Sequence, residues 1–386
     1  SSLHRRFTEP AATRQDLDLM RTSNRDPVEL HARLGAWFGR TLGPGSNPRL
    51  SPLTSPGKAG MSSETLLFDM RWNENGAARN GRFVARLPPP ADAFPLFPRY
   101  DFDMQTRVMR LVGSRSAVAV PKVPWQERDS EALGVPFFVM ERIDGEMVPD
   151  NPPYVFGGWL AGAPAAQQDQ VEQELLCVMA GIHGIEASAE ETAFLQIAHD
   201  GVTPLRRHFA RERALYEWGR SGMRFAPVER LFDWLEAHWP SHEGAAVVNW
   251  GDARPANVLW RDFRAVGVLD WELAMLGPRE MDVGYLIFFH RYFRHVAKLM
   301  AGIDAMPGFL RRDEVVAAYE RRTGARLHDI DWYISYGLLQ QAVVEIRLSQ
   351  RRILFGEMER PACTDEYIYS RRLIGQVVSG DRDVWA

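Results

Sequence analysis

The chain has 386 residues, 45% of them hydrophobic and 25% charged, with a formal net charge of −4 at pH 7. This length can form two lobes around separate cores, and the composition is that of a globular protein rather than a disordered or fibrous one. The slightly acidic balance excludes the overall basic character expected of a nucleic-acid-binding protein.

Cysteine content and hydropathy narrow the class further. The two cysteines, Cys177 and Cys363, are too few for a disulfide scaffold or a zinc site. We expect both to be reduced thiols, with Cys177 in the core because it lies in an apolar helical run. No apolar run approaches the length of a membrane span, and the start SSLHRRF has no signal-peptide core. These features predict a cytoplasmic protein without a membrane partner.

Residues 1–45 are predicted to form a helical extension. Asp26 and Pro27 are a helix-start signal, and Gly43-Pro44-Gly45 ends the helix. Between them an apolar stripe at helical spacing would pack against the body of the protein. Its members are Leu30, Leu34, Trp37 and Phe38.

The pattern from about residue 50 to residue 144 is rich in strands. Thr65–Phe68 and Arg82–Leu87 flank the turn-forming stretch Asn73–Gly81. The small-residue loop before them, Gly57–Glu64, could lay backbone N–H groups against phosphate oxygens. It has neither a Walker pattern nor a Gly-x-Gly-x-x-Gly pattern, so taken alone it indicates a turn.

A basic strand residue, a helix and a buried strand follow this loop. Arg86 ends the strand pattern Phe83–Arg86, residues 103–111 form a predicted helix, and Pro136–Gly145 is typical of a buried strand running into a turn. On their own, Arg86 could be an exposed arginine in a surface ion pair and Pro136–Gly145 a plain edge strand.

Beyond Gly145 the pattern is mostly helical. A helix over Val171–Ile182 ends near His183, which we expect to be a packed helix-end residue. The basic run Arg206–Arg213 is typical of a solvated helix face, but in a binding cleft it would favour an anionic ligand over a polycation. Three further helices are predicted, at residues 282–300, 313–322 and 330–351.

The stretch from 247 to 280 carries the chemistry. Its polar loop contains Asp252 directly after a glycine and Asn257 five residues on, and Asp270 follows the second of two strand-like runs, Val258–Trp260 and Val266–Leu269. A hairpin of this kind can bring the three oxygen-bearing side chains together at one end. Such a set suits phosphoryl transfer, in which an acid orients a hydroxyl while an amide and a second acid hold Mg²⁺.

This stretch resembles the catalytic and metal-binding segment of the aminoglycoside phosphotransferase and choline-kinase-like family. The family pattern is His-Gly-Asp, four residues, Asn, and a strand hairpin closing on Ile-Asp-Trp or Ile-Asp-Phe. Here it reads Trp250-Gly251-Asp252, Asn257 and Leu269-Asp270-Trp271. The resemblance implies an α+β, bilobal protein-kinase-like fold, with a small β-rich N-lobe over residues 46–142 and a larger, mainly helical C-lobe over residues 143–386.

The same resemblance implies an ATP- and Mg²⁺-dependent kinase that phosphorylates a hydroxyl of a small molecule. Asp252 would be the catalytic base, and Asn257 and Asp270 would be the magnesium ligands. The nucleotide would be bound by Gly60, Met61, Ser62, Ser63 and Arg86 at the phosphates and by the backbone of Glu141 and Ile143 at the adenine.

Two positions depart from the family pattern. Trp250 stands at the family's histidine, and we expect this to alter packing rather than chemistry. Gln105 stands where the family has a glutamate that pairs with the basic strand residue, so either an amide or a neighbouring acid makes that pair or the register differs. Asp282, in a segment like the family's Gly-x-Pro-x-x-Asp, is expected to be a structural acid that hydrogen-bonds to the catalytic loop.

The acceptor is left open by the sequence. It could be an aminoglycoside, which would mean antibiotic inactivation, or a metabolite such as a sugar, an amino alcohol or another alcohol. A catalytically weak nucleotide-binding regulator is a further alternative, motivated by Trp250 and Gln105. No nucleic-acid partner is expected, and the sequence does not indicate an oligomeric state.

Overall fold

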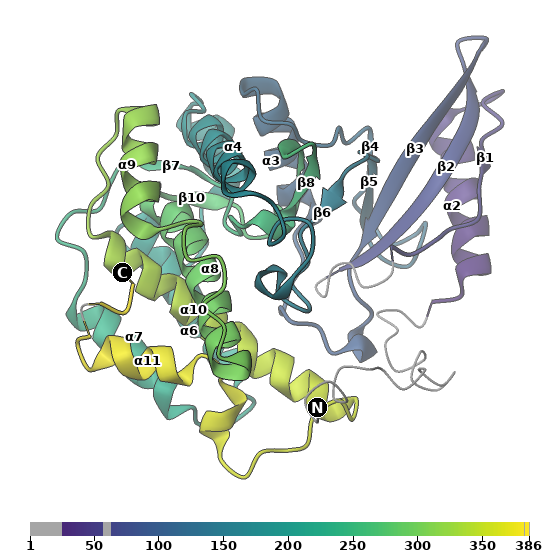
Figure 1. The fold of residues 1–386 in the computed structure, drawn as a ribbon. Coiled ribbons are helices and arrows are strands. Elements are labelled where there is room, and N and C mark those ends of the chain that lie inside the picture. Colours follow the sequence, from purple (N-terminus) through teal and green to yellow (C-terminus); the bar gives the residue numbers. More distant parts are fainter. Residues whose placement is uncertain (1–24, 57–62, 382, 386) are drawn as a thin grey trace.

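Five antiparallel strands form the sheet of the first lobe in the computed structural model, which describes residues 25–56, 63–381 and 383–385 (Figure 1). Their order across the sheet is β1-β2-β3-β5-β4. The strands are β1 (Arg49–Leu50), β2 (Glu64–Glu74), β3 (Ala77–Leu87), β4 (Trp125–Glu127) and β5 (Phe137–Glu141). β2 and β3 pair along their whole length, from Glu64↔Leu87 to Glu74↔Ala77, so this hairpin is longer than the sequence pattern predicts.

Two helices cover opposite faces of this sheet. α2 (Pro27–Leu42) packs its predicted apolar stripe into one cluster with Phe83 and Ala85 of β3. α3 (Phe102–Arg115) lies on the other face, where Phe102 meets Phe138 with ring centroids 5.2 Å apart. Because alternate strand residues point to opposite faces, one sheet can serve both helices.

The predicted helix start at Asp26 is confirmed, since its side chain accepts a hydrogen bond from the backbone N–H of Val28 at 2.8 Å. The helix begins where the sequence predicts it, and its buried residues form part of the core of the small lobe.

The larger lobe is mainly helical but also carries two small sheets. One has the order β6-β8-β9 and contains the predicted hairpin, while the other pairs β7 with β10. These strands are β6 (Glu146–Met147), β7 (Ala246–Asn249), β8 (Val258–Arg261), β9 (Arg264–Val268) and β10 (Met275–Pro278).

The helices of this lobe enclose a core rich in aromatic side chains. They are α4 (Ala165–His183), α5 (Ala189–Thr192), α6 (Pro204–Gly219), α7 (Ala226–Ala237), α8 (Glu280–Ala301), α9 (Arg312–Thr323), α10 (Ile330–Leu354) and α11 (Arg371–Val378). Short 3-10 helices are η2 (Ala91–Ala93), η3 (Tyr154–Phe156), η4 (Ala193–Leu195), η5 (Pro255–Asn257) and η6 (Thr364–Tyr367). The three helices predicted after residue 280 are confirmed as α8, α9 and α10.

One core assignment is wrong. Cys177 is exposed on α4, and its sulfur lies 2.9 Å from the guanidinium of Arg322. The helix turns this position outward, while Val178 and Met179 beside it face the core. The apolar run predicted the helix correctly but not which residues of it are buried.

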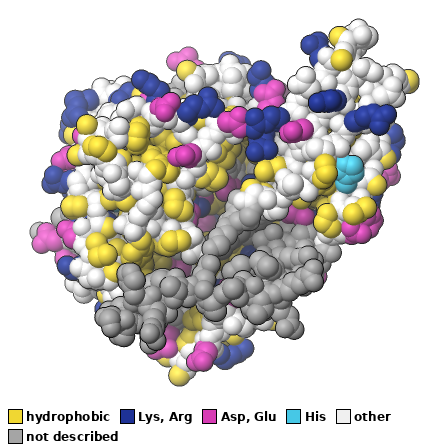
Figure 2. Space-filling model, turned by 45° about the vertical axis from the view of Figure 1, so that its right-hand side comes forward, with side chains coloured by type: hydrophobic (Ala, Val, Ile, Leu, Met, Phe, Trp, Pro, Cys, Tyr) yellow, Lys and Arg dark blue, Asp and Glu magenta, His cyan; other side chains and the backbone are white. Residues whose placement is uncertain are grey.

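None of the described helices is long and apolar enough to span a lipid bilayer. On the face drawn in Figure 2, Lys and Arg side chains are interspersed with Asp and Glu side chains.

Candidate active site

The catalytic loop begins with a glycine that its conformation requires. Gly251 has φ = 89°, and a Cβ added there would lie 2.1 Å from the carbonyl oxygen of Leu273. Only glycine fits both the left-handed conformation and this close approach. The tight turn delivers Asp252 directly from the end of β7 into the site.

Asp282, at the start of α8, stabilises this turn through hydrogen bonds to its backbone. Its carboxylate accepts hydrogen bonds from the backbone N–H groups of Trp250 at 2.7 Å and Gly251 at 2.8 Å. The ring of His183 lies 3.0 Å from the same carboxylate and also contacts the hydroxyl of Tyr319 at 2.7 Å. The expected structural role of Asp282 and the packed position of His183 are both confirmed.

Trp250, at the family's histidine position, is fully buried. Its indole N–H donates to the carbonyl of Leu269 at 2.8 Å, and its ring packs against that of Trp271 with centroids 6.1 Å apart. The indole thus joins the catalytic loop to the end of β9, which explains how the substitution preserves the local geometry.

The carboxylate of Asp252 is buried and held by two neighbours on its own loop. The side-chain amide of Asn257 donates to Oδ2 at 2.7 Å and to the backbone carbonyl of Asp252 at 3.0 Å. The guanidinium of Arg254 donates to Oδ2 at 3.1 Å and places its Nε 2.8 Å from Oδ1. Because the N–H₂ group of Asn257 donates its hydrogen bonds to Asp252, the amide oxygen of Asn257 is the atom that could bind a cation.

Asp270 has the unusual conformation expected at a functional position. Its φ is 59°, in the left-handed region that few non-glycine residues adopt. Its Oδ1 is buried and has no hydrogen-bond partner among the described residues, while the guanidinium of Arg86 lies 3.8 Å away. Burial raises the pKa of Asp270, and the charge of Arg86 opposes that rise.

The side chains of Asp270 and Asn257 fit a magnesium ion. A buried carboxylate oxygen without a partner and a nearby amide oxygen are hard donors of the kind Mg²⁺ prefers, and Mg²⁺ bound to phosphates needs few protein ligands. The described residues contain no group of three His, Cys, Asp or Glu side chains placed to hold a metal.

The predicted nucleotide-binding residues lie along the small lobe and the hinge. Gly60, Met61 and Ser62 fall outside the described residues, whereas Ser63 is buried beside the start of β2. Arg86 projects from β3 with Thr65 Oγ1 at 3.4 Å and Asp270 as its ion-pair partner. Glu141 ends β5, and Ile143 follows at the entry to the large lobe.

The expected partner of Arg86 on the following helix differs from the observed one. Gln105 is buried on α3, and Asp103 pairs with Arg128 at 2.8 Å. The side chain of Arg86 instead hydrogen-bonds to Thr65 and forms an ion pair with Asp270. The ion pair that connects this strand to the site therefore runs to Asp270, after β9, rather than to α3.

Four residues of the site escaped the sequence analysis. Asp150 contacts Arg254, the Arg254 guanidinium lies over the Phe289 ring at 4.8 Å from its centroid, and Tyr285 hydrogen-bonds to Asp252. Burial, and then the charge of Asp252, raise the pKa of Tyr285 well above its ordinary value. The position of Arg254, two residues after Asp252, could have suggested that it belongs to the site. No local sequence pattern indicates the same for Asp150, Tyr285 or Phe289.

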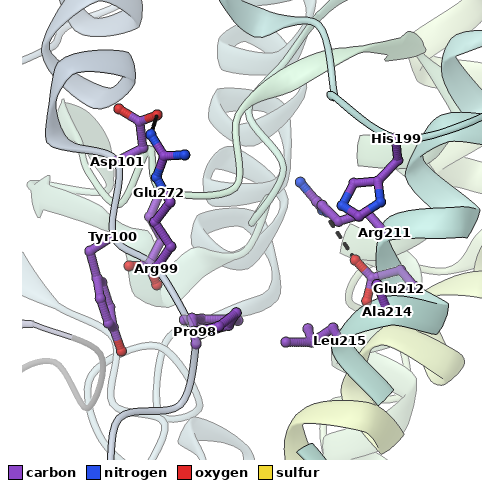
Figure 3. Close-up of a pocket in the computed structure, with 11 residues that line it drawn as sticks. Pro98, Arg99, Tyr100, Asp101, His199, Arg211, Glu212, Ala214, Leu215 and Glu272 are labelled. Carbon is purple, nitrogen blue, oxygen red and sulfur yellow. Dashed lines mark hydrogen bonds and ion pairs between the residues drawn. The ribbon is translucent and has the colours of Figure 1, made fainter. Parts of the chain in front are cut away.

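A cavity of about 360 Å³ lies between the segment that precedes α3 and helix α6, and Figure 3 shows the residues that line it. One wall is the segment Phe97–Asp101, the other is α6 with Arg211, Glu212 and Leu215, and Glu272 comes from the segment after Asp270. Glu272 is two residues after Asp270, so the lining of the cavity includes the segment that follows the second predicted metal ligand. Within the cavity Arg99 pairs with Asp101 at 3.3 Å and Arg211 with Glu212 at 3.1 Å.

Only one residue of the basic run on α6 lines this cavity. Arg206 pairs with Glu236 and lies over the Trp239 ring, and Arg213 lies over the Phe232 ring. Arg211 does reach the cavity, but its charge is matched by Glu212. The run is therefore mostly a paired surface, and it does not make the cavity a basic one.

Comparison with known proteins gives one family match. Residues 68–328 match the model described as the phosphotransferase enzyme family, APH.

The curated relatives are distant and much longer. A probable acyl-CoA dehydrogenase from Arabidopsis thaliana, IBR3, is 22% identical over 338 residues, which are 84% of this chain but 37% of that protein. The chain thus spans little more than a third of its length.

Solved structures show the fold. A putative aminoglycoside phosphotransferase from Ralstonia eutropha matches with a TM-score of 0.60 at 20% identity, covering 90% of this chain and 96% of that one. The macrolide 2′-phosphotransferase MphH from Brachybacterium faecium gives 0.51 at 17% identity, covering 89% and 97%. The aminoglycoside phosphotransferase APH(4)-Ia, in a ternary complex with ADP and hygromycin B, gives 0.50 at 15% identity, covering 90% and 99%. The predicted α+β, bilobal protein-kinase-like fold is confirmed.

Proposed function

Since the chain belongs to the phosphotransferase enzyme family, we propose that it transfers the γ-phosphate of ATP to a hydroxyl of a small molecule. The observation that carries this proposal is the convergence of a buried acid, an amide and a second acid at one end of the β8–β9 hairpin, with a guanidinium 3.8 Å from the second acid. These are the parts that phosphoryl transfer needs.

The residues divide the reaction between them. Asp252 orients the acceptor hydroxyl and takes its proton as the oxygen bonds to the γ-phosphorus and the bond to the β-phosphate oxygen breaks, releasing ADP. Arg86 binds phosphate oxygens, for which its planar fork is suited. Asn257 and Asp270 would hold Mg²⁺, which when bound neutralises charge on the phosphates.

The nucleotide would lie between the lobes. Residues 46–142 would bind it through the loop from Gly60 to Ser63 and through the backbone at Glu141 and Ile143, while residues 143–386 would carry the catalytic and acceptor sites. The structurally similar APH(4)-Ia has been solved in a ternary complex with ADP, which supports the use of a nucleotide.

The cavity between the segment that precedes α3 and helix α6 is proposed as the acceptor site. Its lining includes the apolar side chains of Phe97, Pro98, Tyr100 and Leu215 beside charged ones. Two of the three carboxylates in its lining, Asp101 and Glu212, already pair with Arg99 and Arg211, so a polycation would have to break these pairs to use them. This favours an acceptor with an apolar body and low net charge over a polycationic aminoglycoside.

A second candidate for the acceptor comes from the relatives. The name of the Arabidopsis protein concerns acyl-CoA, and the matched region is about a third of that protein. A phosphotransferase region joined to a dehydrogenase would act on related compounds, so a hydroxyacyl-CoA thioester is a second candidate, which differs from the first because its CoA phosphates make it strongly anionic. Its acyl chain suits the apolar wall of the cavity.

A coupled ADP-release assay with Mg-ATP tests these proposals. The acceptor panel contains an aminoglycoside, a macrolide, choline, a simple sugar and hydroxyacyl-CoA thioesters of short and medium chain, with the Asp252→Ala protein as control. We expect turnover with an acceptor of low charge and none in the variant. Turnover with aminoglycosides alone would overturn the acceptor proposal, and failure of the protein to bind Mg-ATP would overturn the phosphotransferase proposal.

A further inference from the structure

The guanidinium of Arg254 is shared between two carboxylates from distant parts of the chain. It donates to Asp252 on the catalytic loop and, through its other terminal nitrogen, to Asp150 in the segment after the hinge. The arginine side chain is 19% exposed, and its flat face rests on the Phe289 ring of α8. It is held on three sides.

This arrangement restricts the orientation of the Asp252 carboxylate, which the proposed reaction requires. A catalytic carboxylate must keep one orientation toward the acceptor, because small misplacements cost rate. Both oxygens of Asp252 face nitrogens of Arg254, so the orientation of the guanidinium sets that of the carboxylate. Arginine has a long side chain with several rotatable bonds, and an anchor at its far side is needed to fix it.

Asp150 is placed to be that anchor. It follows β6, which pairs with β8 of the catalytic hairpin through Glu146↔Trp260 and Met147↔Leu259. Its own backbone is bridged to Pro153. The anchor therefore follows, by three residues, a strand that pairs with the hairpin between Asn257 and Asp270, and it lies in the large lobe.

Resting on the proposed phosphotransferase activity, we propose that Asp150 is a positioning residue that fixes Arg254 and, through it, the Asp252 carboxylate. Neither Asp150 nor Arg254 need touch the acceptor for this role. The amide of Asn257 reaches only Oδ2 and the backbone carbonyl of Asp252, whereas Nε of Arg254 lies 2.8 Å from Oδ1, so the guanidinium adds a second point of contact on the carboxylate.

Kinetics of Asp150 variants test the positioning role. ADP release is measured both with the best panel acceptor and with water as acceptor, so that the test does not depend on one substrate. For Asp150→Ala we expect kcat to fall roughly tenfold to a hundredfold while KM for ATP changes less than about twofold. Asp150→Glu, which keeps the charge, should recover part of the rate, and Arg254→Lys should not, because lysine lacks the fork that spans two carboxylates.

The matched control is a guanidinium–carboxylate pair away from the site. Arg312 and Asp331 form a two-point contact on the surface, with 2.8 Å between Nη2 and Oδ2. Asp331→Ala should leave both rate and KM unchanged. A wild-type rate in Asp150→Ala, or an equal loss in Asp331→Ala, would overturn the proposal.

Crystal structures separate this inference from the proposed function. In Asp150→Ala we expect the Asp252 carboxylate to rotate away from its wild-type orientation while the backbone of the loop stays in place. An unchanged carboxylate would overturn the positioning role whatever the kinetics. A rotated carboxylate in a protein whose wild type releases no ADP would support the positioning role and overturn the phosphotransferase proposal instead.

Discussion

At the scale of single residues, the site is made of side chains whose hydrogen-bonding capacity is almost fully used. Asp282 holds two backbone N–H groups, Asn257 spends its N–H₂ group on Asp252, and Trp250 donates to Leu269. Among the described residues, Oδ1 of Asp252, Oδ1 of Asp150 and Nε of Arg254 are buried without hydrogen-bond partners, but they belong to the close ion pairs that Arg254 forms with the two acids. Oδ1 of Asp270 is also a buried acceptor without a hydrogen-bond partner, and the Arg86 guanidinium is 3.8 Å from it. Such an atom is costly unless something binds it during function, so it is the natural place for a cation.

Replacing Asp270 with asparagine tests this assignment. Asparagine tolerates the left-handed backbone conformation that Asp270 adopts, so the loop should keep its shape while the negative charge is lost. We expect the Mg²⁺ concentration for half-maximal ADP release to rise roughly tenfold or more, about 1.4 kcal/mol of weaker binding. A titration of activity against Mg²⁺ measures it, with Asp262→Asn in the exposed β8–β9 turn as the matched control. A curve identical to wild type would contradict the assignment.

Restoring the family residue at Trp250 should matter more for stability than for chemistry. Trp250→His removes a buried indole and its hydrogen bond to Leu269, so the free energy of unfolding should fall by about 2 kcal/mol or more. Asp282 still holds the loop, and kcat should stay within about tenfold of wild type. Denaturant unfolding and ADP release measure the two effects. A larger loss of kcat would assign Trp250 a role in the reaction itself.

At the scale of elements, α8 organises the large lobe and the site together. Asp282, Tyr285 and Phe289 on its first turns contact the catalytic loop. The helix also packs closely on α10, because Gly284 faces the backbone of Tyr333 and Gly337 faces the Phe288 ring, at distances that leave no room for a larger side chain at Gly284. A change in the packing of α8 would therefore reach the site directly.

His290 gives α8 a measurable dependence on pH. Its Nδ1 accepts from the Tyr154 hydroxyl at 2.8 Å and its Nε2–H donates to the carbonyl of Met306 at 3.2 Å, so the ring is neutral. Burial lowers the pKa of His290 from 6.5 to about 3. Because the unfolded chain takes up this proton more readily, the stability contributed by His290 is present above pH 6.5 and is lost as pH falls below it.

His290→Gln should reduce this dependence. Between pH 7 and pH 5 we expect the wild type to lose about 2 kcal/mol more of its unfolding free energy than the variant, from one and a half units at about 1.4 kcal/mol each. Urea unfolding at the two pH values measures the difference. Equal losses in the two proteins would show that His290 is not the buried neutral group described here.

Local chemistry explains which elements the sequence predicts and which it does not. The catalytic hairpin, α2 and the late helices follow from periodicity, caps and turn residues, all of which act within a few residues. Asp150 and Arg254 lie 104 positions apart, and no local pattern can reveal that they meet. The partner of Arg86 was missed for the same reason, since Asp270 reaches it only when the two lobes come together.

At the scale of the whole molecule, the lobes are joined by more than the hinge. The segment between β3 and α3 runs from the small lobe down to α6 and α10. There Arg347 of α10 donates to the carbonyl of Pro95 at 2.7 Å, and its guanidinium lies over the rings of Phe94 and Trp218, at 3.7 and 4.3 Å from their centroids. The next residues along this segment, Phe97–Asp101, form a wall of the proposed acceptor cavity.

Arg347→Ala should free this second connection. The variant loses one charge-assisted hydrogen bond and two cation–π contacts, so residues 94–101 should exchange amide hydrogens faster, by roughly tenfold or more, while β8 and β9 keep their wild-type protection. Arg347→Lys is the matched variant. It keeps the charge but loses the flat group that fits between two rings, and it should give an intermediate rate. Hydrogen exchange read by mass spectrometry distinguishes the cases. Uniformly faster exchange across both lobes would mean that Arg347 supports the large lobe's core, and unchanged exchange at 94–101 would mean that the hinge alone positions this wall of the cavity.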